Sequence, residues 1–254
     1  MKSRIAATVW PIMLLLIAAA LWEWAVRIFK IPAYLLPPPT EIFKTAWLKC
    51  DLLLGHTLVT LAEVGLGFLL ALVVGVALAA AIQSSKILER ALLPLIVASQ
   101  TIPVFAIAPL LVLWFGYGIG SKVVMTAVIV FFPITINTAR GLRAVDPDTL
   151  ALLTILEARP WQVFIKVRAP QSLPFLFTGI KIAVAVSVIG AVIGEWVGAR
   201  KGLGYLMVQA NAQLKIELVF AAILYLSAIG TGFYALAALL ERKLVPWRRS
   251  DFID

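Results

Sequence analysis

The chain has little of what soluble enzymes and metalloproteins need. Charged residues make up 14% of its 254 residues, and it has one cysteine, Cys50, and one histidine, His56. An intrachain disulfide and a histidine-rich metal site are therefore excluded, and no catalytic constellation of clustered carboxylates is present. No G-x-x-x-x-G-K-[ST] phosphate-binding loop occurs, so the chain itself is not expected to bind ATP. These absences argue against a metalloprotein, an ATPase and a membrane-embedded enzyme.

Apolar residues dominate instead, at 62% of the chain. A soluble domain is nearer to half apolar, so the bilayer is the solvent that suits this composition. A spanning helix needs roughly 20 apolar residues, and the sequence predicts an all-α membrane protein of about six transmembrane helices in one domain, residues 1–254. The first apolar run has no small-residue cleavage site after it and is interpreted as a retained span. The six expected segments are Thr8–Phe29, Thr57–Ile82, Leu92–Phe115, Val123–Thr138, Leu173–Gly198 and Leu218–Leu240.

The formal net charge of +9 is spread between the apolar segments. Nucleic-acid binding would need a basic face or run, and none is present. If the N-terminus is cytoplasmic, thirteen lysines and arginines fall on the inner side and eight on the outer side, with Lys181 inside a span. The positive-inside rule therefore favours a multi-pass protein with both termini in the cytoplasm.

The first connecting segment is expected to carry a short helix at the outer membrane surface, at about residues 39–52. Three prolines, Pro37–Pro39, stop the first span. Ile42 and Trp47 are among the apolar residues that then follow at helical spacing, which is typical of an interfacial helix.

The segment at about residues 139–172 is expected to fold into two short amphipathic helices in the cytoplasm. Asp146 is a favourable cap for a helix that begins at Pro147. After a break, a proline opens a second helix, Trp161–Val167, which is expected to end before Pro170. A protein that folds only in lipid does not need such a loop, so we expect it to dock a soluble partner.

The fifth apolar segment carries small residues at steps of three and four, which keeps them on one side of a helix. Small residues let a second helix approach closely in lipid. We expect this stripe to pack tightly, either within the subunit or across a dimer axis. Its members are Gly179, Ala183, Ser187, Gly190, Gly194 and Gly198.

The 139–172 loop resembles the cytoplasmic signature loop of binding-protein-dependent ABC importer permeases, of the nitrate/sulfonate/taurine type. The stretches that carry the resemblance are Gly141-Leu142-Arg143-Ala144-Val145-Asp146-Pro147, Arg159-Pro160-Trp161-Gln162-Val163-Phe164 and Ala169-Pro170-Gln171-Ser172-Leu173-Pro174. Further matches cover nearly the whole chain in order, among them Ala108-Pro109-Leu110-Leu111, Thr178-Gly179-Ile180-Lys181-Ile182-Ala183 and Gly194-Glu195-Trp196-Val197-Gly198-Ala199.

The resemblance implies a type I importer fold in the inner membrane. Two permease subunits, here as a homodimer, would form the pathway, and an extracytoplasmic binding protein would deliver the substrate. A cytosolic ATPase dimer would bind ATP and Mg and dock on the coupling helices of the loop. No cofactor, metal site or catalytic residue is then expected in this chain. The residues that the resemblance assigns to ATPase coupling are Glu157, Ala158, Arg159, Pro160 and Trp161.

The chain departs from this family at several positions. The family loop has glycine where this chain has Glu157, and a glutamate in a left-handed helix end costs about 1 kcal/mol or more. The family's Glu-Ala-Ala reads Ala151-Leu152-Leu153 here. Glu63 stands where sulfonate-type members carry a basic residue. Glu63 and the stretch Ala98–Pro103 look more like the branch for pyrimidine precursors of thiamine or for riboflavin.

Ionisable groups inside a membrane are costly and so are candidates for function. For each of them a structural role is the alternative: Glu23 could pair with Arg27 one turn later, and Lys181 could extend toward the cytoplasm. The candidates for the pathway or its gate are Glu63, Gln100, Lys181 and Glu195.

The charges also bear on the substrate. A pathway for anions gains from fixed positive charge, and the sequence places only Lys181 well inside a span. The acidic residues Glu23, Glu63 and Glu195 fall toward the outer half and would repel an anion. We therefore expect a small, largely uncharged heterocycle, such as a pyrimidine precursor of thiamine.

Two alternatives remain open. The first is the same permease role for a sulfonate, taurine or nitrate. The second and more distant one is a secondary transporter, which would show two repeated halves and an ion site at the membrane midplane. Six segments with no clear repeat and a docking loop count against the second.

Overall fold

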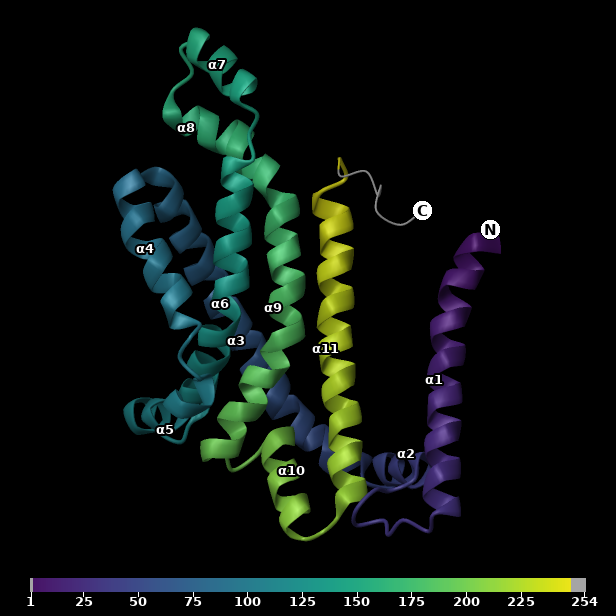
Figure 1. Ribbon diagram of the computed structural model, residues 1–254. Coiled ribbons are helices and arrows are strands. Elements are labelled where there is room, and N and C mark those ends of the chain that lie inside the picture. The colour runs from purple at the N-terminus through teal and green to yellow at the C-terminus, as the bar shows by residue number, and fades with distance from the viewer. Residues whose placement is uncertain (1, 248–254) are drawn as a thin grey trace.

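The computed structural model describes residues 2–247, and every element within that range is helical (Figure 1). Together, five long helices and one bent pair confirm the prediction of an all-α membrane protein with about six spans. The five helices that are long and apolar enough to cross a membrane are α1 (Lys2–Ile28), α3 (Cys50–Ser84), α6 (Ile119–Arg143), α9 (Ala169–Gly198) and α11 (Ile216–Leu244). The bent pair is α4 (Lys86–Ser99) with α5 (Val104–Phe115), and the shorter helices are α2 (Pro39–Leu48), α7 (Pro147–Ile155), α8 (Pro160–Val163) and α10 (Leu203–Ala212).

The bundle has two distinct ends, which we call the α7 end and the α10 end. Helices α7 and α8 project beyond the spans at the α7 end, whereas α2 and α10 lie at the opposite one (Figure 1). Helix α1 begins, and α11 ends, on the side of the α7 end. The chain therefore crosses the bundle an even number of times, as six spans require.

Helices α3, α6 and α9 form the core, and small residues let them approach closely. The buried Thr126 of α6 lies between glycines of the two neighbouring helices. A Cβ atom on Gly67 of α3 would lie 2.5 Å from Thr126 Cβ, and one on Gly190 of α9 would lie 2.9 Å from Thr126 Cα. In lipid, where apolar side chains gain little from leaving the solvent, such close contact is what holds helices together.

The apolar run Leu92–Phe115 does not form the single span that its hydropathy predicts. It is broken between Ser99 and Val104, and α4 and α5 meet at an angle of 100°. Proline explains the break, because Pro103 has no N–H to give to a helix and disfavours helical backbone at Ile102 before it.

Other boundaries also differ from those expected. Helix α6 extends beyond Val123–Thr138 by about one turn at each end. The expected outer helix at 39–52 is α2, which stops at Leu48, and α3 begins at Cys50. Of the predicted 139–172 loop, residues 144–168 lie outside the spans α6 and α9.

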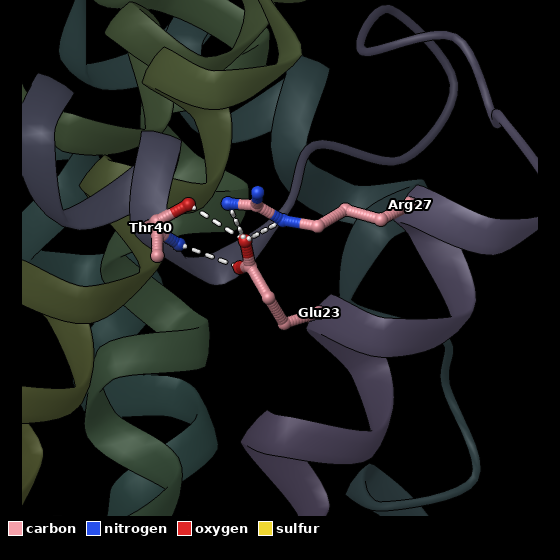
Figure 2. A network of polar contacts seen from close by, with 3 residues as sticks. All are labelled: Glu23, Arg27 and Thr40. Carbon is pink, nitrogen blue, oxygen red and sulfur yellow. Dashed lines mark hydrogen bonds and ion pairs between the residues drawn. The ribbon is translucent and has the colours of Figure 1, made fainter.

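Helix α1 is joined to α2 through one carboxylate. Arg27 donates to Glu23 Oε1 at 2.7 Å, and Thr40 donates to Glu23 through both its backbone N–H, at 3.0 Å, and its hydroxyl, at 2.9 Å (Figure 2). The pairing of Glu23 with Arg27 that the spacing predicts is therefore present, and Thr40 adds the contact to α2. Farther from this joint α1 stands apart from the core, and α11 lies between them (Figure 1).

Candidate functional site

The loop at the α7 end is built as the sequence predicts in its first half. Asp146 accepts a hydrogen bond from Thr149 N–H at 3.3 Å and caps α7. At the other end of α7, Glu157 has a φ of 52°, in the left-handed region that favours glycine. Its N–H donates to Thr154 O, and Ala158 N–H donates to Leu153 O, both at 3.0 Å. This pair of bonds is a Schellman helix end, so the turn forms with glutamate at the position where the family has glycine.

The same loop exposes large apolar side chains. Trp161 is 69% exposed and Ile155 is 78% exposed, and Leu152 and Leu156 are exposed beside them. Ala158 is half-buried between the two short helices, while Arg159 and Pro160 are exposed. The loop projects away from the spans (Figure 1), so lipid does not explain this apolar surface. An exposed apolar patch in such a place indicates a protein-docking surface.

The second short helix does not end before Pro170, and that part of the prediction is wrong. Helix α8 runs through a π-helical turn, Phe164–Arg168, directly into α9, so that Pro160–Gly198 is one continuous helical segment of 39 residues. The wider turn lets Ala169 N–H reach Phe164 O, and Pro170 then falls in the first turn of α9, where its missing N–H is tolerated. The docking loop is thus an extension of a core span.

A buried cluster of charged residues lies toward the α10 end. Glu63 from α3, Lys122 from α6 and Glu195 from α9 are each at most 3% exposed. The carboxyl groups of Glu63 and Glu195 are neighbours, and the Lys122 ammonium group interacts electrostatically with both. Glu63 Oε2 is buried without a hydrogen-bond partner. A cluster of this composition is electrically neutral when the two carboxyl groups hold one proton between them, which reduces the cost of burying it.

Glu195 fixes the start of α10. Its Oε2 accepts the N–H groups of Gly204, at 2.5 Å, and Tyr205, at 3.2 Å, while its Oε1 accepts the Thr60 hydroxyl at 2.6 Å. A carboxylate at a helix N-terminus is favourable, since it meets unpaired N–H groups and the positive end of the helix dipole. A Cβ atom on Gly202, which has a φ of 121°, would overlap the Glu195 carboxyl group. The turn before α10 is therefore built around this carboxylate.

Lys122 performs the complementary role for backbone carbonyls at the end of α9 and in the turn before α6. Its Nζ donates to Gly198 O at 2.5 Å, to Tyr117 O at 2.9 Å and to Gly118 O at 3.1 Å. The charge count of the sequence includes Lys122 among the eight basic residues of the outer side, and it did not predict that this side chain is buried. The signal that could have predicted the burial is the position of Lys122 in the first turn of α6, which starts at Ile119. The span expected from the sequence starts only at Val123, so Lys122 was counted outside it.

The other two pathway candidates lie away from this cluster. Lys181 forms an ion pair with Glu241 of α11, which is a contact between two spans. Gln100 lies at the break between α4 and α5 and is exposed. Of the four candidates, the structure therefore brings Glu63 and Glu195 together and separates Lys181 and Gln100 from them.

The small-residue stripe of α9 is used inside the subunit. All six of its members are buried. A Cβ atom on Gly179 would lie 2.7 Å from Pro133 O of α6, and one on Gly198 would lie 2.9 Å from a methyl carbon of Val112 in α5. Because the stripe packs against α6 and α5, it does not indicate a dimer interface.

Comparison with known proteins agrees with this architecture. The family model described as "binding-protein-dependent transport system inner membrane component" matches residues 67–246. The chain is 42% identical over 224 residues to a probable ABC transporter permease protein of Haemophilus influenzae, which covers 88% of this chain and 91% of that protein. It is 42% identical over 242 residues to a formylaminopyrimidine transport permease protein of Halalkalibacterium halodurans, covering 95% and 96%. It is 40% identical over 242 residues to a riboflavin transport system permease protein of Chloroflexus aurantiacus, covering 94% and 90%.

Proposed function

Because the chain belongs to the family of binding-protein-dependent transport system inner membrane components, it is a non-catalytic permease subunit of an ABC transporter, and we propose that its α7–α8 loop is the surface on which a cytosolic ATPase dimer docks. The observation that carries this proposal is the exposed apolar surface around Trp161 and Ile155. The α7 end is then cytoplasmic, and both termini lie on that side. The α10 end faces an extracytoplasmic binding protein that delivers the substrate.

The continuity of α8 with α9 supports a mechanical role for the loop. A force applied to α8 when the ATPase closes acts on one helical segment that extends to Gly198 at the α10 end. Glu157, Ala158, Arg159, Pro160 and Trp161 are the residues that we assign to this coupling contact. ATP and Mg are bound by the ATPase partner.

A matched pair of substitutions tests the coupling contact. Ala158→Glu places a charged side chain between the short helices, and it is expected to lower ATP-driven uptake at least about tenfold, as the loss of about 1.4 kcal/mol of docking energy would. Ala151→Glu makes the same chemical change at an exposed position of α7 where the resembling family itself carries glutamate, and it is expected to leave uptake unchanged. Both variants must be present in the membrane in wild-type amounts. Wild-type uptake by Ala158→Glu would contradict the proposal.

We further propose that a second permease, most simply a second copy of this chain, completes the pathway. Within one subunit α3, α6 and α9 are packed at glycine contacts, which leaves no room for a substrate to pass between them. Only 6% of the apolar stretch of α1 is buried within the subunit, so its surface is available to lipid or to a partner. Co-purification of two differently tagged copies from one membrane tests the homodimer. A second permease of different sequence in the complex would replace it with a heterodimer.

For the substrate, we propose a small, largely uncharged nitrogen heterocycle such as a pyrimidine precursor of thiamine. The charges give this proposal less support than the sequence suggests. Lys122 is a buried cation near Glu63 and Glu195, and Glu23 is paired with Arg27. The support comes from the relatives, two of which are named for formylaminopyrimidine and riboflavin transport at 42% and 40% identity. Calorimetry on the cognate binding protein tests the choice. Tight binding of taurine, an alkanesulfonate or nitrate, without binding of a hydroxymethylpyrimidine or riboflavin, would rule it out.

A further inference from the structure

The break between α4 and α5 lies deep within the part of the chain that crosses the membrane. Helix α4 has 14 residues and is about 20 Å long at 1.5 Å per residue, which is shorter than the roughly 30 Å of a bilayer's apolar core. Its last turn still packs near the α7 end, since Ile96 contacts the cluster that contains Ala139 and Leu142. Helix α5 already packs nearer the α10 end, where Ala108 contacts Met125. The break is therefore level with the middle of α6.

The four residues of the break are exposed in the subunit. Gln100, Thr101 and Pro103 are exposed, and Ile102 is 51% exposed. Within the break the N–H groups of Gln100 and Thr101 donate to Val97 O, at 3.1 Å, and Ala98 O, at 3.0 Å, so only part of the backbone lacks the regular helical bonds. Backbone that leaves the helix occurs at this depth only where protein covers it or where it lines water. The break therefore does not face the hydrocarbon. In secondary transporters, which are a different class, broken helices form the substrate site.

The side chains of the break can recognise a neutral polar ligand. The Gln100 amide nitrogen donates to Ser99 Oγ at 3.3 Å, a weak internal bond that leaves the carboxamide available. A carboxamide presents one donor edge and one acceptor edge, which pair with an exocyclic amine and the adjacent ring nitrogen of a heterocycle, as glutamine and asparagine do with adenine. The Thr101 hydroxyl donates to Ala98 O at 2.8 Å and keeps its oxygen as an acceptor.

We propose that the α4–α5 break, residues 100–103, lines the aqueous path and that Gln100 and Thr101 form a transient contact site for a nitrogen heterocycle with adjacent donor and acceptor groups. This rests on the permease function proposed above. The site carries no charge, which suits a neutral ligand better than a sulfonate or nitrate. The rival arrangement is a break covered by the second permease subunit, dry and without contact to substrate.

Cysteine accessibility separates the two arrangements. In a Cys50→Ser background, Thr101→Cys and Ile102→Cys are placed in the break. Val73→Cys provides a control on α3, because Val73 is 62% exposed and lies beside Ala71, which packs with Val130 at the middle of α6. The assembled complex of permease, ATPase and binding protein, in proteoliposomes, is treated with a charged, membrane-impermeant methanethiosulfonate. We expect both break positions to react at least about tenfold faster than Val73→Cys, since the reagent needs water to reach them. Equal rates at the three positions would overturn the proposal.

Transport by a Gln100 variant tests the contact itself. Gln100→Leu keeps the size of the side chain and removes both hydrogen-bonding groups, and Gln100→Asn retains them on a shorter chain. With hydroxymethylpyrimidine and riboflavin as probes, we expect Gln100→Leu to lower uptake about fivefold to tenfold, the loss that one or two hydrogen bonds produce, with partial recovery in Gln100→Asn. ATP hydrolysis stimulated by the loaded binding protein should change less than about twofold, because the coupling loop is intact. Wild-type uptake by Gln100→Leu would overturn the contact site, whereas a wild-type complex that hydrolyses no ATP and moves neither probe would instead overturn the proposed function.

Discussion

Lys122 and Gly198, which are 76 residues apart in the chain, are joined by a hydrogen bond of 2.5 Å from the lysine Nζ to the glycine carbonyl. The bond connects the first turn of α6 to the last turn of α9. Next to it, Glu195 holds the start of α10 through Gly204 and Tyr205. One buried group of charges therefore positions the start of α6, the end of α9 and the start of α10 at the α10 end, where we propose that the binding protein docks.

Replacing Lys122 with methionine is expected to destabilise the permease strongly. Lys122→Met keeps a long side chain but removes the donor to the Gly198 carbonyl, and a buried acceptor left without its partner costs about 1–3 kcal/mol. The substitution also removes the cation that interacts electrostatically with Glu63 and Glu195. The thermal midpoint of the purified subunit in detergent measures the effect. Lys44→Met, at an exposed lysine of α2, is the control and should be silent.

A double substitution tests whether charge balance is the cause. Adding Glu195→Gln to Lys122→Met removes the one negative charge that the two carboxyl groups carry when they share a proton, so the double variant should be more stable than Lys122→Met alone, in a non-additive way. Additive losses would show that Lys122 acts only through the carbonyls of Tyr117, Gly118 and Gly198.

Replacing Glu157 with glycine is expected to stabilise the docking loop. Glu157 has a φ of 52°, and glycine adopts this conformation without steric cost, which is worth about 1 kcal/mol. Hydrogen–deuterium exchange at the amides of Glu157 and Ala158, whose bonds close the turn, should become slower in the Glu157→Gly variant. Faster exchange would mean that the glutamate side chain supports the turn in another way.

The glycine contacts of the core predict different responses to the same substitution at two positions. Gly190→Leu would force side-chain atoms into the backbone of Thr126, and overpacking of this kind should cost more than about 3 kcal/mol. Gly232→Leu, on α11, meets nothing within 4 Å and should be tolerated. The yield of folded, monodisperse protein from membranes measures both. Similar yields for the two variants would contradict the packing described for α6 and α9.

The proposed orientation predicts the result of reporter fusions. A fusion at Ile155 in α7 and one at the C-terminus should both report a cytoplasmic location, because the positive-inside rule and the α7–α8 docking surface agree on this side. A fusion within residues 213–215, after α10, should report the opposite side. An extracytoplasmic signal at Ile155 would reverse the orientation and remove the docking proposal with it.

The sequence by itself determined the features that depend on local chemistry. The apolar runs predicted the spans because the length and composition of one segment decide whether it can lie in lipid. The cap at Asp146 and the pairing of Glu23 with Arg27 followed from spacings of three and four residues. The left-handed turn at Glu157 was anticipated from the family resemblance, and its cost follows from the backbone of that residue alone.

The tertiary structure decided everything that depends on partners far apart in the chain. Lys122 has the same chemistry whether it is exposed or buried, and only the approach of α9 supplies the carbonyl of Gly198 and the carboxyl group of Glu195. The small-residue stripe of α9 would suit close packing against a helix of the same subunit as well as against a helix of a second subunit. It packs within the subunit because α6 and α5 lie against it. The hydropathy of Leu92–Phe115 is that of an unbroken span, because an average over a window does not register the 100° bend at a single proline.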